Sequence, residues 1–343
     1  MPYQLLQGGT LRRRRRPRRR PPLRRASRLV PVVLVLAIAG LLLMATGTGE
    51  RPRAVPVARA ADPAAAALDA GTAPLAGGGT SPLGVTLDGP DVVRQRFAHA
   101  PRSGLLFDLD SGRVLWRHAP ARVLPIASLT KMMTALVVAD RVRPGARVPI
   151  TRQALAYHGS GVGLLPRGRS IPVRTMLYGL LLPSGNDAAI ALAQRAARTV
   201  PRFVSLMNAR ARAMGLACTR FSTPSGFRDT GNHSCAGDLA AIARAVLREP
   251  RLAPIVGTRS AELPFPIKGG KLYLYNNNPL LRAGYRGTTG VKTGYTDAAG
   301  SCLVATVQRG RSRLGVVLLH SPNTGGQAQR LLDRGFAALR RTG

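Results

Sequence analysis

Apolar residues recur with two different periods along the chain, and the two periods occupy different regions. Between residues 129 and 247 they repeat mostly at helical spacing, and on either side of that region they form short runs typical of strands. Helices are predicted at 129–139, 174–182, from 187 onward, 201–214, 235–247 and 326–341, and strands at 105–109, 113–116, 290–295, 301–308 and 314–320. Asp110-Ser111-Gly112 between the first two strands predicts a hairpin. This order predicts an α+β fold in which helices pack on an antiparallel sheet.

The first 91 residues differ in composition from the rest. Residues 1–28 contain eleven arginines and no acidic residue, residues 29–45 are seventeen uncharged, mostly apolar residues, and residues 46–91 are rich in Ala, Gly and Pro. We therefore expect a basic cytoplasmic tail, a transmembrane anchor or signal segment and a flexible linker, followed by a folded domain over 92–343. Because flanking arginines stay in the cytoplasm, the domain is expected outside the cell membrane. It is secreted if the apolar segment is cleaved.

Positive charge is spread over the whole chain. The formal net charge is +36, and removing the eleven charges of residues 1–28 leaves +25 on the remainder. No aromatic residues are interleaved with the basic block and no nucleic-acid-binding motif follows it, so a nucleic-acid partner is not expected. Beside an apolar segment, the arginines favour a topology signal or attraction to anionic lipids, and the membrane is the expected partner.

Three cysteines are present, at positions 218, 235 and 302. In an exported domain, Cys218 and Cys235 could pair across a short loop, and reduced, buried cysteines are an equally open alternative. The cysteine spacing indicates no metal site, and no cofactor is expected.

Lysine is rare in this chain, and two of the lysines lie in short motifs with serine or threonine. Only four of the 51 basic residues are lysines, and two of these occur in Ser128-Leu129-Thr130-Lys131 and Lys292-Thr293-Gly294. Ser184-Gly185-Asn186 lies between them, in a predicted interhelical loop. An ammonium in a dry cleft can lose its proton, whereas a guanidinium stays charged. The two lysines therefore indicate a site that uses a neutral amine.

Ser128, Lys131 and Ser184 are the predicted catalytic residues. A serine hydroxyl is a poor nucleophile until a base takes its proton. Lys131 follows Ser128 by three residues, which places both side chains on one helix face. Desolvation and the nearby charge of Lys292 would leave the Lys131 amine neutral, and Ser184 could relay protons to the leaving amine.

The remaining motif residues are predicted to bind substrate. Asn186 could hold the lysine or a substrate amide, Lys292 and Thr293 could bind a carboxylate, and Gly294 lets a substrate backbone approach the strand. The backbone N–H groups of Ser128 and Tyr295 could stabilise an oxyanion.

Four segments resemble the signatures of one family: residues 125–134, 181–187, 233–239 and 290–300. They are similar to those of the D-alanyl-D-alanine carboxypeptidases, the serine peptidases among low-molecular-mass penicillin-binding proteins. The resemblance implies a sheet with helices on both faces and an acyl-enzyme that removes the terminal D-alanine from peptidoglycan stem peptides. It also implies inhibition by β-lactam antibiotics. Residues 221–227 depart from the family's usual pattern, which leaves the preferred substrate open.

Other functions use the same residues. A D,D-endopeptidase that cuts peptidoglycan cross-links has the same chemistry, and a non-catalytic penicillin-binding wall protein could keep the fold. A β-lactamase needs a deacylating carboxylate, but Glu249 and Glu262, the only glutamates between Ser184 and Lys292, do not stand in the expected pattern. The global positive charge could draw the domain to anionic wall polymers, and a composition bias without function would give the same charge.

Overall fold

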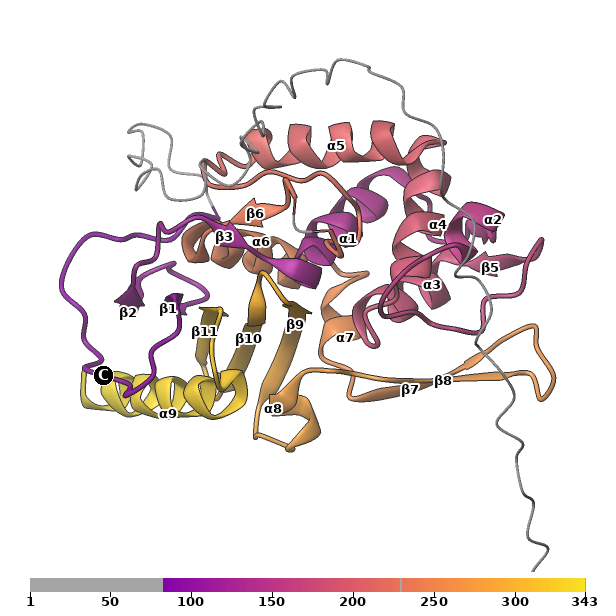
Figure 1. Ribbon diagram of the computed structural model, residues 1–343. Helices are drawn as coiled ribbons and strands as arrows, with labels where there is room; N and C mark the ends of the chain where they lie inside the picture. Colours follow the sequence, from indigo (N-terminus) through magenta and orange to yellow (C-terminus); the bar gives the residue numbers. More distant parts are fainter. Residues whose placement is uncertain (1–82, 229, 343) are drawn as a thin grey trace, which may run out of the picture. The chain divides into compact units, whose positions relative to one another are not determined.

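The computed structural model describes residues 83–228 and 230–342 (Figure 1). The predicted basic tail and the apolar segment at 29–45 lie outside these residues, as does most of the predicted linker. Within the part that is described, no helix combines the length and the hydropathy needed to cross a bilayer. The proposed boundaries of the segments at 1–28, 29–45, 46–91 and 92–343 remain predictions.

Five antiparallel strands form the main sheet. They are β1 (Ser103–Asp108), β2 (Val114–His118), β9 (Thr288–Thr296), β10 (Gly300–Arg309) and β11 (Ser312–Leu319), arranged in the order β2-β1-β11-β10-β9. The antiparallel pairing of β1 with β2 confirms the predicted hairpin. The last strand of the chain, β11, pairs with β1. This pairing brings the two ends of the domain into one sheet and leaves β9 at its edge.

Helices cover both faces of this sheet, as Figure 1 shows. Helix α9 (Thr324–Thr342) packs on one face, where its apolar residues join those that alternate along β10 and β11. The intervening residues of these strands point to the other face, because successive side chains alternate across a strand. There they pack against α6 (Ala236–Arg248), behind which lies α1 (Thr130–Arg141). The predicted α+β fold is confirmed.

Four of the remaining helices lie in a layer with α1. They are α2 (Arg152–Leu155), α3 (Val173–Leu181), α4 (Asn186–Ala197) and α5 (Val200–Ala213). The short helix α7 (Ala253–Val256) packs against β9, α3 and α6, and α8 (Pro279–Arg282) packs against α9 and β9. Helix α1 is buried along almost its whole length and contacts α3, α4, α5 and α6. Its apolar sequence reflects a position inside the helical layer.

Three small ribbons accompany the sheet. They pair β3 (Leu124–Pro125) with β6 (His233–Ser234), β4 (Arg147–Pro149) with β5 (Ser170–Pro172), and β7 (Ser260–Pro264) with β8 (Lys271–Tyr275). The sequence patterns did not predict them. The β3–β6 pair matters for the site, because it joins the segment just before Ser128 to the segment just before α6.

Two arginines hold the first described residues against the domain. Arg117 on β2 donates to the Leu87 and Gly89 carbonyl oxygens and pairs with Asp91, with 2.7 Å between Nε and Oδ1. The buried Arg244 on α6 donates to the Gly84 carbonyl at 2.5 Å and also to two carbonyls at the end of β1. These bonds add to the apolar contacts that Leu83, Val85 and Leu87 make with the core.

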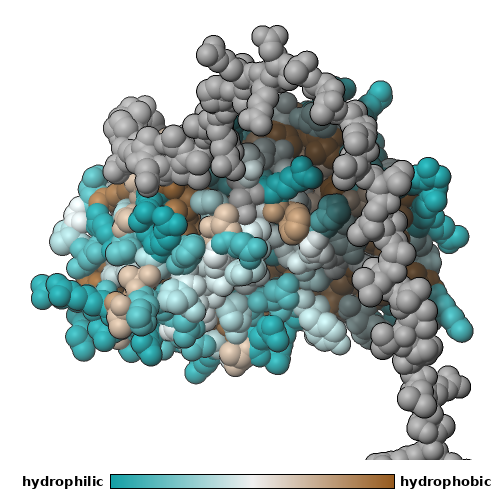
Figure 2. Space-filling model, in the orientation of Figure 1, coloured by the Kyte–Doolittle hydropathy of each residue, from teal (hydrophilic) through white to brown (hydrophobic). Residues whose placement is uncertain are grey.

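The visible surface is largely polar. Figure 2 shows hydrophilic side chains over much of the face on which α9 and the ends of the sheet strands lie in Figure 1. This agrees with an arginine-rich chain whose apolar residues are concentrated in two buried clusters.

Candidate active site

Ser128 lies in a 3₁₀ turn, η1 (Ala127–Leu129), that leads directly into α1. Its side chain does not cap the helix. Its Oγ instead lies 2.7 Å from the Nζ of Lys131, one turn later on the same face. The turn thus directs the hydroxyl to the lysine.

The Lys131 side chain is fully buried and has three oxygen neighbours. Nζ lies 2.7 Å from Ser128 Oγ, 2.7 Å from Asn186 Oδ1 and 2.8 Å from the Ser225 carbonyl oxygen. Burial, followed by the nearby charge of Lys292, holds the pKa of Lys131 well below its ordinary value, and Asp187 opposes the shift only in part. A neutral amine can donate two hydrogens to Asn186 and Ser225 and accept the Ser128 proton with its lone pair.

Ser184 and Asn186 come from the short connection between α3 and α4. Ser184 has φ +69° and a buried hydroxyl that makes no hydrogen bond within the described part of the chain. Asn186 is the first residue of α4, and its Nδ2 donates to the His158 carbonyl oxygen at 2.5 Å. The two amide atoms of Asn186 therefore join Lys131 to the loop at 156–169. Among the described residues, the Ser184 hydroxyl makes no hydrogen bond with either lysine.

Lys292, Thr293 and Gly294 lie on the edge strand β9. Lys292 is buried, its Nζ donates to the Thr293 carbonyl oxygen at 3.0 Å, and burial lowers its pKa to about 7. Gly294 touches the serine turn so closely that an added Cβ would lie 2.9 Å from the Ile126 carbonyl oxygen and 3.0 Å from the Ser128 nitrogen. The strand is thereby fixed against the turn that carries the hydroxyl.

Tyr295 follows this contact and is the most open of the predicted residues. Its side chain is 66% exposed, and in the sheet it is the register partner of Ser301. Because Gly294 lies against the Ser128 nitrogen, the backbone of Tyr295 is one residue from the same turn. The side chain can therefore meet solvent or substrate while the backbone stays in the sheet.

Asp187 is a site residue that sequence reasoning did not single out. It is fully buried, and its carboxylate accepts from the backbone N–H groups of Val162 at 2.9 Å, Gly163 at 3.1 Å and Ala188 at 2.7 Å. It fixes the loop that approaches Asn186 and places a negative charge near Lys131. The signals for it were its position next to Ser184-Gly185-Asn186 and its place at the end of the family-like segment 181–187.

The segment at 221–227, where the sequence departs from the family pattern, lies over the start of α1, and its contacts with this helix were not predicted. The Pro224 carbonyl oxygen accepts from Thr134 Oγ1 at 2.6 Å, and the Ser225 carbonyl accepts from Lys131. Gly226 has φ +72°, and a Cβ there would clash with the Ala127 carbonyl. Backbone carbonyl oxygens make these contacts with Thr134 and Lys131, so a motif of side-chain types could not predict them.

Cys218 and Cys235 form a disulfide, with their Cα atoms 5.6 Å apart. The sequence had left this pairing open. The bond closes the loop that contains residues 221–227. Asp238 lies beside the two sulfurs, but its carboxylate accepts from the backbone N–H of Cys218 and the hydroxyl of Thr219. Since the disulfide leaves no thiolate there, this group of potential ligands does not fit a metal ion.

The geometry defines a class of site. A buried amine with a lowered pKa touches a serine hydroxyl at a helix start, and an edge strand with a second buried lysine lies against the same turn. These are the parts of a serine and lysine acyl-transfer site, in which the amine is the base and the strand receives an extended substrate.

Comparisons with known proteins identify the family. The sequence profile of the D-alanyl-D-alanine carboxypeptidases (Peptidase_S11) matches residues 91–323, and the chain belongs to this family. D-alanyl-D-alanine carboxypeptidase DacF of Bacillus subtilis is 32% identical over 248 residues, which are 70% of this chain and 63% of that protein. DacB2 of Mycobacterium tuberculosis is 37% identical over 241 residues, which are 68% of this chain and 81% of that protein.

The fold is also that of a solved relative. The crystal structure of the Streptomyces K15 DD-transpeptidase matches with a TM-score of 0.66 and 31% identity, and the match covers 71% of this chain and 100% of that one. The match to DacF leaves more than a third of that protein uncovered, so this chain spans less than two thirds of its length.

Proposed function

We propose that the protein is a serine-type D-alanyl-D-alanine carboxypeptidase that removes the terminal D-alanine from peptidoglycan stem peptides. The observation that carries this proposal is the 2.7 Å contact between Ser128 Oγ and the fully buried amine of Lys131. Family membership supports the same reaction.

In the first half-reaction, the neutral Lys131 takes the Ser128 proton as Oγ attacks the carbonyl carbon of the penultimate D-alanine. The negative charge that develops on the carbonyl oxygen is stabilised by the backbone N–H groups of Ser128 and Tyr295. The C–N bond breaks, and the proton reaches the leaving amine through the Ser184 hydroxyl, whose hydrogen-bonding capacity is unused among the described residues. The products are free D-alanine and an ester on Ser128.

In the second half-reaction, water attacks the ester carbonyl. Lys131 again accepts a proton, and it returns that proton to Ser128 Oγ when the ester bond breaks. The shortened peptide leaves with a new carboxylate, and the site is restored.

Lys292 and Thr293 would bind the terminal carboxylate of the substrate. An arriving carboxylate favours the charged form of Lys292, whose pKa of about 7 leaves it ready to take up a proton near neutral pH. The substrate backbone would extend along β9, the edge strand of the sheet. A β-lactam antibiotic would use the same carboxylate site and acylate Ser128.

The location we propose is the outer face of the cell membrane, with residues 1–28 in the cytoplasm and residues 29–45 as the anchor. Eleven arginines before seventeen uncharged residues support this orientation. Cleavage of the apolar segment would give a secreted enzyme with the same site.

The test compares the full-length chain with S128A and with S205A, a control serine on the exposed surface of α5. We expect wild type and S205A to bind fluorescent penicillin covalently and to release D-alanine from a pentapeptide ending in D-Ala-D-Ala, and S128A to do neither. Cleavage of a cross-linked dimer in preference to the pentapeptide would make the protein an endopeptidase. Penicillin labelling without release from either substrate would make it a non-catalytic wall protein.

A further inference from the structure

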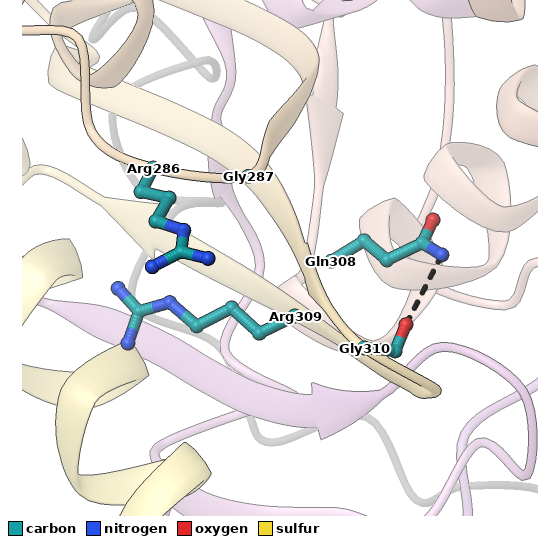
Figure 3. A pocket seen from close by; sticks show the side chains of 5 residues that line it. All are labelled: Arg286, Gly287, Gln308, Arg309 and Gly310. Carbon is teal, nitrogen blue, oxygen red and sulfur yellow. Dashed lines mark hydrogen bonds between the residues drawn. The ribbon is translucent and has the colours of Figure 1, made fainter.

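A basic pocket lies at the far end of the strand that carries Lys292. It has a volume of about 590 Å³ and is lined by Arg286, Gly287, Gln308, Arg309 and Gly310 (Figure 3). Gly287 precedes β9, and the five residues from there to Lys292 span about 17 Å in an extended strand. The pocket is therefore separate from the serine site, and none of the residues discussed there lines it.

Arg309, the last residue of β10, is held in place before any ligand arrives. Its guanidinium lies between two rings, 4.9 Å from the centroid of Tyr285 and 4.7 Å from that of Phe336. One nitrogen donates to Asp333 Oδ1 at 3.2 Å, and the Tyr285 hydroxyl donates to the same oxygen at 2.6 Å. A planar guanidinium fixed in this way loses little side-chain freedom when its remaining N–H groups bind a ligand.

Arg286 enters the same pocket from the other side, as Figure 3 shows. It is exposed, and it makes no hydrogen bond or ion pair with any residue that the structure describes. The lining residues include two guanidinium groups and no carboxylate. Asp333 balances the charge of Arg309, so one positive charge in the pocket remains uncompensated.

We propose that this pocket binds a phosphodiester group of an anionic cell-surface polymer. A phosphodiester carries one negative charge, which matches the single uncompensated charge. Its two non-bridging oxygens can each accept from a different guanidinium, and arginine forks fit phosphate well. A volume of about 590 Å³ leaves room for the units next to the phosphate along the polymer. Binding there would hold the protein on the polymer while the serine site, at the other end of β9, stays open.

The experiment measures binding of full-length protein to poly(glycerol phosphate) at fixed, low salt. R286Q removes the unpaired charge, and R286K keeps the charge but lacks the planar guanidinium that can donate two parallel hydrogen bonds. R202Q, on the exposed face of α5, removes one charge elsewhere and is the matched control. We expect R286Q to weaken binding about tenfold or more, the range for charge-assisted hydrogen bonds. R286K should weaken it less than R286Q, and R202Q by less than about twofold.

Three further probes separate the possible sources of the anion. Inorganic phosphate should bind more weakly than the polymer, and polyglutamate should bind without dependence on Arg286. Phosphatidylglycerol vesicles carry the same phosphodiester, but one of its two substituents is held in the bilayer and cannot enter the pocket, so their binding should not depend on Arg286 either. Equal effects of R286Q and R202Q would overturn the proposal, because the attraction would then be general. The proposal would also be overturned if binding to polyglutamate or to the vesicles depended on Arg286. The same holds if free phosphate bound through Arg286 as strongly as the polymer does.

This proposal does not depend on the reaction at Ser128. Penicillin labelling of every variant is measured in parallel, and we expect it to be unchanged. Loss of labelling in the wild type would count against the proposed function and would leave the pocket's result intact.

Discussion

The disulfide between Cys218 and Cys235 offers a direct test of how the active site is held together. Its two cysteines are 17 residues apart, and the loop between them carries the Ser225 carbonyl that accepts from Lys131. Replacing both cysteines by alanine opens this loop. In the chain-entropy description, a crosslink across a loop of this length stabilises the folded state by about 3 kcal/mol. We expect the double variant to lose about that much free energy of unfolding.

The loop should also loosen over the site, because the disulfide joins its two ends. Other contacts keep the loop near the domain, among them the bonds of Asn208 to Phe221 and of Thr134 to the Pro224 carbonyl, so we expect a shift of the loop and not its release. When the loop moves away, Lys131 loses an acceptor and its position relative to Ser128 becomes less fixed. We expect acylation by a β-lactam to become several-fold slower while the site residues themselves are unchanged.

Urea unfolding and the rate of acylation by fluorescent penicillin measure the two effects. The matched control is C302A, which truncates a buried cysteine outside the disulfide and so reports the cost of removing a buried sulfur. Two results together would contradict this reasoning. The double variant would lose no more free energy of unfolding than twice the loss in C302A, and it would be acylated at the wild-type rate. The disulfide would then not hold the loop against Lys131.

Four further predictions concern the charges and the backbone of the site. Burial lowers the pKa of Lys292 to about 7, so the unfolded chain binds more protons than the native one between pH 7 and about pH 10. The free energy of unfolding should therefore rise with pH over that range. Urea titrations should show this rise in the wild type and a smaller one in K292M. The acylation rate should fall above about pH 7 as Lys292 loses the charge that binds a carboxylate, and a rate that is constant to pH 9 would contradict this role. D187N removes a charged acceptor from backbone N–H groups and should cost about 1–3 kcal/mol, with faster hydrogen exchange at Val162. G226A forces a Cβ against the Ala127 carbonyl and should reduce penicillin labelling strongly, whereas G310A, at a similar φ in an open turn, should leave labelling unchanged.

Much of the fold could be predicted because its elements have strong local patterns. The apolar run that became α1 and the short apolar runs that became β10 and β11 lie close to their predicted ranges. The β7–β8 ribbon was missed although Lys271–Tyr275 alternates between exposed and buried residues. The partner strand β7, Ser260–Pro264, contains a glutamate and ends at a proline, residue types that are depleted in strands, so its sequence did not predict a strand.

In the candidate site, residues that act through their side chains could be predicted from the sequence, and those that act through backbone atoms could not. The structure brings the predicted residues Ser128, Lys131 and Asn186 together, and the sequence indicated them because their side chains make the contacts. Ser225 contributes a carbonyl oxygen, which every residue has, so nothing in the sequence distinguishes it. The pairing of Cys218 with Cys235 depends on a distance of 5.6 Å that arises only after α6 and the segment before it have packed.

The two arginines that hold residues 84–91 have a mechanical consequence. If the chain is tethered through its N-terminal part, force on the tether reaches the domain at Gly84, whose carbonyl oxygen accepts a hydrogen bond from Arg244 on α6. Arg117 provides the next attachment at Leu87 and Gly89. Load would then be divided between a helix and a strand before it reached β1, and less of it would reach the serine turn.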